Sequence, residues 1–560
     1  MSFNEDAGFP SPGFRLGFPV MQVRTNPETG KNSFLLLSTD GSRTEFRRMG
    51  TSSLYESTDS SYAALDSGSM ILRTANGTQL SFVSLAGLFQ CTQIKDRNGN
   101  YINLNYDGFG RIDTIVDTLS RTIKFNYDAN QTLASITQNW TINGQTQTYT
   151  WASFTYANVT IQTNFPDLFV AGPQNSSSIR MLTQVTVNDG SRFNFEYTSW
   201  GQVWKIRNHA SDGHLLNYRS YDLPQTNAVA LQDCPRFTER RDWAENWNRG
   251  GAPGPTGLPA GPEQEVVTHY DVPVSVSWTS LNGGLETGTL ARVTAPDGTY
   301  NKIYFAGADP ASAWRRGLPA YVETYSAGND LQRQVATTWT QDTSVSSYYE
   351  INPRVTETNT YEPSGNRVRV VIAYVSVNVG DGTTCKLPQD VFEYQADGST
   401  VLRRSHTTYN LTTPYLSRRI IGLPLEKSLY GVDPNTLTET LMSKVEFYYD
   451  ESPIEGAADP VAIQHDNTNF GMNSLTGRAN LTSVRRYDVE NTSQFTATTN
   501  KYNRTGSLVS AKDALGHGVT LSYTDAFAST ADPLDAPRTF ATLAYPTKVD
   551  DADDYSTRFR

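Results

Sequence analysis

A short pattern built on the dipeptide Tyr-Asp recurs at fixed spacing along this chain. The stretch 105–136 reads NYDGFGRIDTIVDTLSRTIKFNYDANQTLASI, and Tyr-Asp occurs in it twice, 21 residues apart. Upstream of each Tyr stand two further positions with spacings of 3 and 7: Asp96, Gly99 and Tyr106, then Asp117, Ser120 and Tyr127, and far downstream Asp513, Gly516 and Tyr523. A constant period of this length indicates a repeat architecture, which limits the available folds more than any other feature of the chain.

The residues that lead to each Tyr alternate between apolar and polar. Ile102, Leu104 and Tyr106 therefore share one face of an extended segment, as expected for a β-strand with one wet face. Asp, Asn and Gly at the segment boundaries predict turns. One unit is thus turn, strand, turn, strand. A single hairpin cannot bury its own apolar face, so we expect successive hairpins to stack edge to edge.

Further positions of the unit repeat as well. A Gly follows the Tyr by four residues at Gly110, at Gly201 after Tyr197 and at Gly506 after Tyr502, whereas Gln131 takes that place after Tyr127. In the middle of the chain, a Leu-Pro pair precedes a Tyr by six residues, counted from Pro319, Pro388 and Pro424. Proline is tolerated at a strand entrance, so we interpret these cassettes as a degenerate form of the same unit.

The pattern divides the chain into four parts. Residues 1–90 alternate without Tyr-Asp and are predicted to form an N-terminal entry section of the same sheet. Residues 91–225 and 266–560 carry the repeats. Residues 226–265 are predicted to be a Gly/Pro- and Trp-containing insertion on the wall, in which the charged part 236–248 suggests a short helix. Elsewhere helical periodicity is almost missing, which predicts an all-β protein.

Composition excludes several classes of function. A net charge of −11 argues against a nucleic-acid binder, which needs a basic face. Hydrophobic residues make up only 37%, which suits strands that are wet on one side or on both. No run of about 18 apolar residues is present, so no membrane-spanning helix is expected. The first residues show no signal peptide, and three distant cysteines give neither a disulfide framework nor a metal knuckle.

These motifs resemble the YD repeats of the rearrangement-hotspot (RHS) family. The segments DRNGNYINLNYDGFGRIDTI, DTLSRTIKFNYDANQTLASI and YNRTGSLVSAKDALGHGVTLSY carry the resemblance. It implies a long antiparallel β-sheet ribbon of stacked hairpins that spirals into a hollow shell, or β-cocoon. Relatives include bacterial polymorphic toxins, cocoon proteins of insecticidal toxin complexes and teneurin-like proteins. In the toxin relatives the shell encloses a C-terminal toxic segment, and a core domain can act as an aspartyl protease. No signature of that core is visible here.

The end of the chain fits the repeat only in part. Asp551 and Asp554 align with Asp513 and Gly516, so the next Tyr is expected at the position after Arg560. We therefore expect the chain to stop within a repeat and to be a fragment of a longer protein. The partner of the shell would then be either the missing C-terminal part of the same chain or a separate polypeptide that the shell encloses.

Catalytic and metal-binding patterns are weak in this sequence. Asp96, Asn98 and Asn100 resemble the start of a calcium loop, but Tyr101 stands where glycine is needed, so a hairpin turn is favoured. Asp107 and Asp128 occupy equivalent places in successive units and are better explained as turn caps than as paired catalytic carboxylates. The six His are scattered, and no nucleophile or phosphate-binding motif occurs. We predict no enzymatic activity, no cofactor and no metal.

Aromatic residues offer one alternative function. Trp200, Trp204, Trp243 and Trp247 could stack on sugars, although aromatic packing on a sheet is commoner. The leading hypothesis is a structural shell segment, secreted or at the cell surface through bacterial-type export, that encloses, protects or presents a polypeptide. The first alternative is a surface adhesin that binds a glycan or a protein of another cell. A glycoside-active enzyme is a third, with support only from abundant Asp and aromatic residues.

Overall fold

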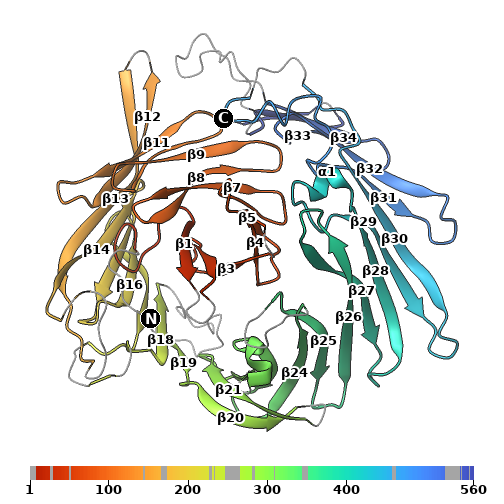
Figure 1. Ribbon diagram of the computed structural model, residues 1–560, viewed down its shortest axis with the longest axis horizontal. Coiled ribbons are helices and arrows are strands. Elements are labelled where there is room, and N and C mark those ends of the chain that lie inside the picture. Colours follow the sequence, from red (N-terminus) through yellow and green to blue (C-terminus); the bar gives the residue numbers. More distant parts are fainter. Residues whose placement is uncertain are drawn as a thin grey trace.

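All strands of the described chain belong to one antiparallel sheet of 36 strands (Figure 1). The computed structural model describes residues 8–25, 30–49, 52–142, 145–165, 173, 175–225, 230–231, 234–245, 265–280, 284–307, 310–342, 351–456, 462–523, 543, 545–553 and 555–559. Within these residues, two short helical segments interrupt the strands, η2 (Pro310–Arg315) and α1 (Thr413–Leu416). The predicted all-β, antiparallel ribbon of stacked hairpins is therefore confirmed.

The first eight strands close into a barrel. They are β1 (Val20–Thr25), β2 (Asn32–Leu37), β3 (Arg43–Arg48), β4 (Leu54–Ser57), β5 (Ala64–Asp66), β6 (Ile71–Arg73), β7 (Gln79–Leu85) and β8 (Leu88–Lys95). Each strand pairs with the next, and β1 also pairs with β8 through Val20↔Gln90 and Met21↔Phe89. The interior is a packed core with Met21, Phe46 and Leu65 at 0% exposure. Closure removes the free edge that the first strand would otherwise expose.

From β8 onward the sheet continues as a ribbon. Its first half consists of β9 (Tyr101–Tyr106), β10 (Ile112–Val116), β11 (Thr122–Tyr127), β12 (Leu133–Ile142), β13 (Gln145–Thr160), β14 (Ser178–Val187), β15 (Arg192–Tyr197), β16 (Val203–His209), β17 (Leu215–Tyr221), β18 (Glu239–Ala244), β19 (Val266–Tyr270), β20 (Val274–Thr279), β21 (Leu285–Thr294) and β22 (Tyr300–Ala306). Neighbours in sequence are neighbours in space, except that β21 pairs with both β19 and β20. Strand order thus follows chain order, as hairpin stacking requires.

The second half repeats this arrangement. It comprises β23 (Pro319–Tyr325), β24 (Leu331–Thr340), β25 (Arg354–Tyr361), β26 (Arg367–Asn378), β27 (Thr384–Tyr394), β28 (Val401–Tyr409), β29 (Pro424–Val432), β30 (Glu439–Tyr449), β31 (Leu481–Tyr487), β32 (Phe495–Tyr502), β33 (Leu508–Lys512), β34 (Gly518–Ser522), β35 (Lys548–Asp550) and β36 (Ser556–Arg558). The predicted turn after Asp550 is present, since Asp551 N–H donates to Tyr555 O at 3.0 Å.

The insertion 226–265 contains a strand where the sequence suggested a helix. Residues 239–244 form β18, which pairs with β17 on one side and β19 on the other. The helix prediction for 236–248 is therefore wrong over this part. Two neighbouring strands with open backbone groups favour a strand between them, whatever the local propensity of the charged residues. Residues 246–264 lie outside the described chain.

The ribbon curves into a ring that meets its own beginning. In Figure 1 the barrel strands β1, β3, β4 and β5 lie inside the ring, and β9 comes near β33 at the top. The turn 96–100 between β8 and β9 contacts the loop 462–480, as the bridge Asn100↔His465 shows. The barrel turns contact the loop that carries α1, through the bridge Asn76↔Ile420. We call this line of contacts the seam.

Candidate functional site

Each Asp of the repeat shapes a hairpin turn by accepting backbone hydrogen bonds. In the turn 107–111, Asp107 Oδ1 accepts from Phe109 N–H at 2.9 Å and from Arg111 N–H at 3.0 Å. Gly110 N–H donates to Asp107 O, and Gly110 has φ +78°. This is a type I turn closed by a left-handed residue, where glycine is strongly favoured. The same bonds form at Asp96, Asp117, Asp128 and Asp513.

The carboxylate of such a turn is a cap and stays ionised. Partial burial would raise the pKa of Asp107, but the pKa is lowered because Arg111 and two backbone N–H groups donate to the carboxylate. Burial would likewise raise the pKa of Asp128, but hydrogen bonds from Thr132 and Asn130 and the charge of Arg180 together lower it. Each carboxylate is therefore occupied by its own turn, which is the placement that a structural role requires.

The Tyr of each unit reaches across to the neighbouring hairpin. Tyr127 OH donates to Ile112 O at 2.7 Å, and Ile112 is the residue that faces Tyr106 in the register of β9 and β10. The register shifts next to Ile112, so a β-bulge lies there. Tyr156 OH donates in turn to Leu133 O at 2.8 Å, and Leu133 faces Tyr127 beside the next bulge. Each Tyr therefore satisfies a carbonyl at the bulge of the hairpin before it.

This series of bonds, which we call the tyrosine ladder, runs along two sections of the ribbon. The first section starts at β8 and ends at β15, and its members are Tyr106 to Cys91 O, Tyr127 to Ile112 O, Tyr156 to Leu133 O and Tyr197 to Leu182 O. The second section starts at β23 and ends at β34, with bonds from Trp339 to Pro319 O, Tyr374 to Val355 O, Tyr409 to Pro388 O, Tyr449 to Pro424 O, Tyr502 to Leu481 O and Tyr523 to Leu508 O.

The Leu-Pro cassettes mark ladder positions. Pro319, Pro388 and Pro424 each supply an acceptor carbonyl beside a register shift. A bulge leaves one residue without its ladder bond, so the missing N–H of proline costs little there. Trp339 takes the place of a Tyr, because its indole N–H donates to Pro319 O at 2.9 Å. Proline can therefore stand at the acceptor position, which needs only a carbonyl group. Trp can replace Tyr at the donor position, which needs only an N–H or O–H group.

Tyr106 and Tyr127 lie on the same face of adjoining hairpins. Both pack in the cluster around Ile112, Phe125 and Leu133, and β10 pairs with β11. Tyr106 also packs against the barrel core, whose strands lie inside the ring in Figure 1. The tyrosine face is therefore turned toward the enclosed barrel. Burial raises the pKa of Tyr106 and Tyr127 well above the usual value, so both hydroxyls keep their protons and remain donors.

The opposite face of the sheet is polar and, in the second half, charged. Arg369 donates to Glu357 at 2.9 Å and lies 4.4 Å from the ring centre of Tyr394. Arg404 is paired with Asp390 at 2.6 Å and lies 4.6 Å from the ring centre of Tyr430. Lys444 contacts both Glu426 and Glu446 at 3.0 Å. These charges neutralise one another in a network across neighbouring strands.

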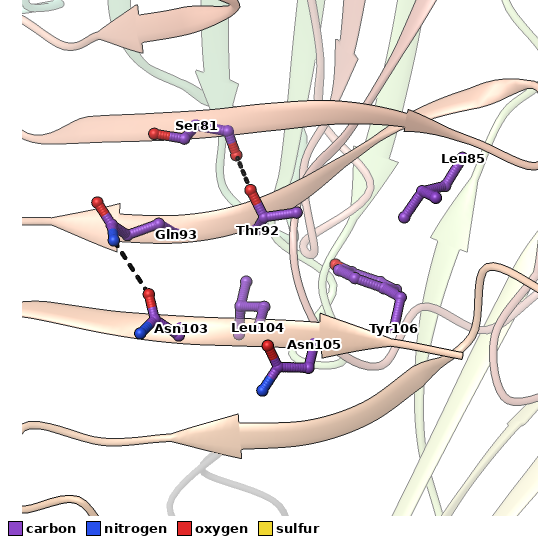
Figure 2. A pocket seen from close by; sticks show the side chains of 8 residues that line it. All are labelled: Ser81, Leu85, Thr92, Gln93, Asn103, Leu104, Asn105 and Tyr106. Atoms are coloured by element: carbon purple, nitrogen blue, oxygen red, sulfur yellow. Dashed lines mark hydrogen bonds between the residues drawn. The ribbon is translucent and has the colours of Figure 1, made fainter. Parts of the chain in front are cut away.

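At β7, β8 and β9 this polar face is hollowed without forming a built site. Figure 2 shows Gln93 and Asn103 side by side on neighbouring strands, joined by a hydrogen bond of 3.0 Å. Thr92 donates to Ser81 O at 3.3 Å in the same view. The open depression has a volume of about 440 Å³, and no charged residue lines it. Its polar groups satisfy one another.

The seam is built around a buried arginine. Arg478 has 0% exposure, and its guanidinium donates only to backbone carbonyls: Ser474 O at 2.8 Å, Gly471 O at 3.0 Å, Arg504 O at 2.6 Å and Asn98 O at 3.4 Å, besides Phe470 O. Asn98 belongs to the turn 96–100 and Arg504 to the turn 503–507. One side chain therefore joins three segments that lie far apart in sequence.

Backbone pairing and close packing complete this part of the seam. Tyr101 N–H donates to Gln464 O and Asp466 N–H donates to Gly99 O, each at 2.9 Å. A Cβ at Gly99 would lie 2.6 Å from the Phe470 ring. Glycine is required there for space as well as for its φ of +94°.

His465 lies beside Arg478 in the same junction. Its Nε2 is 3.0 Å from Asn98 O and 3.2 Å from Arg504 O, and its Nδ1 is 3.0 Å from Asn467 Oδ1. Burial lowers the pKa of His465, and Arg478 lowers it further, although these oxygen contacts oppose the shift. The imidazole is therefore neutral at neutral pH, and its protonation would place a second buried cation beside Arg478.

A buried ion pair forms the second part of the seam. Arg419, 2% exposed, contacts the carboxylate of Glu56 from the barrel and donates to Asp381 Oδ2 at 2.7 Å. It also donates to Tyr62 O at 2.6 Å. Removing one partner of such a pair leaves an uncompensated buried charge, so this contact strongly specifies how barrel and ribbon dock.

The aromatic residues proposed for glycan contact differ in burial and in their neighbours. Trp200 is 3% exposed and packs against Phe165 at 5.2 Å. Trp243 stacks on Tyr218 with ring centres 5.4 Å apart, and Lys205 lies 5.7 Å from the ring centre of Trp204. Trp247 lies outside the described residues. Among the described residues, glycan binding would have to use the partly exposed Trp204 and Trp243.

Metal and membrane signals are weak over the part of the chain that the structure describes. Within it, no group of three or more His, Cys, Asp and Glu is placed to hold a metal ion. Its helices are too short to cross a bilayer. Cys91, Cys234 and Cys385 are free thiols.

The residues that build the seam were not identified from the sequence. Glu56, Arg419 and Arg478 carried no motif, and His465 counted only as one of six scattered His. One signal was available: the long intervals 410–423 and 450–480 interrupt the repeat and hold His, Arg and Asp. Loops of such length in a repeat protein are common places for functional contacts.

Comparisons with known proteins give remote similarities only. No family model matches the sequence, and no curated protein matches it. Among solved structures, a TcdB2-TccC3-Cdc42 complex aligns over 96% of this chain at 10% identity with a TM-score of 0.20. The Photorhabdus luminescens Tc holotoxin pore aligns over 96% at 9% identity with a TM-score of 0.19. A porin-like protein from Bacteroides uniformis aligns over 60% of this chain and 85% of its own, at 10% identity and a TM-score of 0.16.

The chain spans about 31% of the length of the TcdB2-TccC3-Cdc42 chain and 30% of the holotoxin chain. TM-scores of this size do not establish a shared fold. The fold described above therefore stands on the strand pairing alone.

Proposed function

We propose that this protein is a wall segment of a β-shell that encloses or protects a polypeptide. The observation that supports the proposal is the seam: a ribbon of hairpins returns to its own start and is held there by Arg478 and by the pair of Glu56 and Arg419. A ring closed by buried polar contacts has an interior, and the tyrosine face of the first section lines that interior beside the barrel. The resemblance of the repeats to the RHS family agrees with this function.

The role we propose is mechanical. Backbone pairing along the ribbon leaves few edges exposed, and the tyrosine ladder fixes each hairpin on the next. The charges of the opposite face are neutralised within the sheet. We propose no catalytic step, no cofactor and a location outside the cytoplasm after bacterial-type export.

Site-specific photocrosslinking tests the proposal. Val185 and Thr186 are neighbours in β14 whose side chains lie on opposite faces, since Val185 faces Phe154 and Thr186 faces Ser153 across β13. Phe154 packs in the same cluster as Tyr106 and Tyr127, so Val185 shares the tyrosine face beside the barrel. Benzoylphenylalanine at position 185 should crosslink to a co-purifying polypeptide in the native host, and the same group at position 186 should not.

The matched pair also separates the alternative function. Crosslinks at position 186 to a host-cell glycoprotein, with none at position 185, would support a surface adhesin. Crosslinks at neither position in secreted material would contradict enclosure.

A further inference from the structure

A second cavity lies between the N-terminal segment and the first Tyr-Asp turn. It has a volume of about 390 Å³. Its walls are mainly apolar, with Phe9, Phe18, Leu88, Tyr106, Phe109 and Ile112 among them, while Arg15 and Arg111 supply charge. Pockets that bind small ligands commonly measure about 300–1,000 Å³ and combine apolar walls with a few placed polar groups. The cavity meets both conditions.

The wall formed by residues 9–17 is held in place. Leu16 N–H donates to Phe9 O at 2.7 Å, and Phe9 N–H donates to Phe14 O at 3.0 Å. The Phe9 ring lies 6.5 Å from the rings of both Phe125 and Tyr127. A Cβ at Gly17 would lie 2.8 Å from Ile112 Cδ1, so the segment approaches β10 closely. The cavity is thus formed before any ligand arrives.

The rim of the cavity exposes apolar side chains. Phe109 is 72% exposed and Leu16 is 36% exposed. Phe109 projects from the turn 107–111 and Leu16 from the segment 9–17, and burial of either side chain against a ligand would remove apolar surface from water. The rim therefore favours a ligand that carries an apolar group.

The two arginines of the cavity differ in their partners. Arg111 is paired with Asp107 and lies 4.1 Å from the ring centre of Tyr127. Arg15 has no carboxylate partner among the described residues, and the charged neighbour that acts on it is Arg43. Burial lowers the pKa of Arg15 and repulsion by Arg43 lowers it further. An anion placed there would relieve this repulsion.

We propose that this cavity binds an acidic, apolar peptide segment, with a carboxylate on the Arg15 guanidinium and a neighbouring apolar side chain against Phe9, Phe18 and Phe109. A guanidinium holds a carboxylate through two parallel hydrogen bonds. The cavity opens beside Tyr106, on the face turned toward the ring interior. The source of the peptide, an enclosed chain, rests on the function proposed above, but the pocket itself does not.

Four short peptides test the site. N-acetyl-Phe-Asp-Phe-amide and its Asn counterpart measure the contribution of a side-chain carboxylate, and N-acetyl-Phe-Phe with a free or an amidated C-terminus measures that of a terminal carboxylate. We expect saturable binding by calorimetry, at least tenfold tighter for an acid than for its amide, because charge-assisted hydrogen bonds are lost in the amide. The acid that binds more tightly identifies the source of the carboxylate.

Variants of one arginine complete the test. Arg15→Gln should lose at least tenfold in affinity for the acid, and Arg15→Lys should lose less, since it keeps the charge but not the planar fork. Arg24→Gln, a matched change on the exposed part of β1, should have no effect. Equal affinity for acid and amide, or unchanged binding in Arg15→Gln, would overturn the proposal. A negative result for the peptides together with crosslinking at position 185 would exclude the proposed pocket and leave the proposed shell function supported.

Discussion

The tyrosine ladder makes a quantitative prediction at Tyr127. Changing Tyr127→Phe keeps the ring and removes only the hydroxyl that donates to Ile112 O at 2.7 Å. Ile112 is 6% exposed, so water has little access to the carbonyl that is left without its partner. A neutral hydrogen bond contributes about 0.5–1.5 kcal/mol, and an unsatisfied buried acceptor costs about 1–3 kcal/mol. We therefore expect a loss of about 1–2 kcal/mol.

The loss should be local, because the backbone of each hairpin in the ribbon pairs with its neighbours in sequence. Hydrogen exchange followed by mass spectrometry should show amides of 106–133 exchanging about 5–30 times faster. Amides of β26–β30 should be unchanged. Tyr270→Phe is the control: its ring packs on Phe237 at 5.4 Å, and its hydroxyl makes no hydrogen bond within the described residues. Equal effects of the two changes, or acceleration spread over the whole chain, would refute the ladder.

Three further predictions concern the turns and the seam. Ser120 has φ +59° where other copies have Gly, so Ser120→Gly should raise the unfolding midpoint, with a gain of about 0.5–1 kcal/mol; a loss would contradict the turn geometry. Arg478→Met should cost more than about 3 kcal/mol and expose 96–103 and 462–480 to exchange, because buried carbonyls lose their donor. The control is Arg121→Met, because the Arg121 side chain is 56% exposed, and it should change stability by less than about 0.5 kcal/mol. Equal losses of stability in the two variants would contradict the role of Arg478 in holding the seam. His465 has a lowered pKa, so the stability that it contributes is present above about pH 6.5 and falls as the medium is acidified. His465→Gln should flatten this decline between pH 7.5 and 5.0 in urea unfolding, and an unaltered pH profile would exclude the role of His465.

Glu56 acts in the opposite direction within the same pH range. Burial raises its pKa to about 7, although Arg419 opposes the shift. A carboxyl with a raised pKa contributes stability at low pH that is lost as pH rises through about 4.5 to 7. Glu56 is present in the wild type and in His465→Gln alike. The difference between their stability–pH profiles therefore reports on the histidine alone.

Local chemistry made the repeat unit predictable. The alternation that ends at Tyr106 and the Asp-Gly turn after it depend on residues a few positions apart, so strand, turn and shared face could be read from the sequence. The turn caps at Asp107 and Asp128 follow from the same short-range rules. The tyrosine partners could not be read, because each acceptor depends on where a bulge falls in the neighbouring hairpin.

The helix expected in 236–248 failed for a related reason. Its charged residues carry no strong strand preference, but β17 and β19 offer backbone groups on either side. Pairing with two strands outweighs the weak helical propensity of this short segment.

By itself the sequence determined an antiparallel ribbon of stacked hairpins, because period, turn chemistry and side-chain alternation act within one unit. Only the tertiary structure decided that the ribbon closes. Glu56 and Arg419 lie 363 residues apart, and Arg478 reaches Asn98 across 380 residues. Such contacts depend on the curvature accumulated over all the strands between them, a quantity that no single repeat contains.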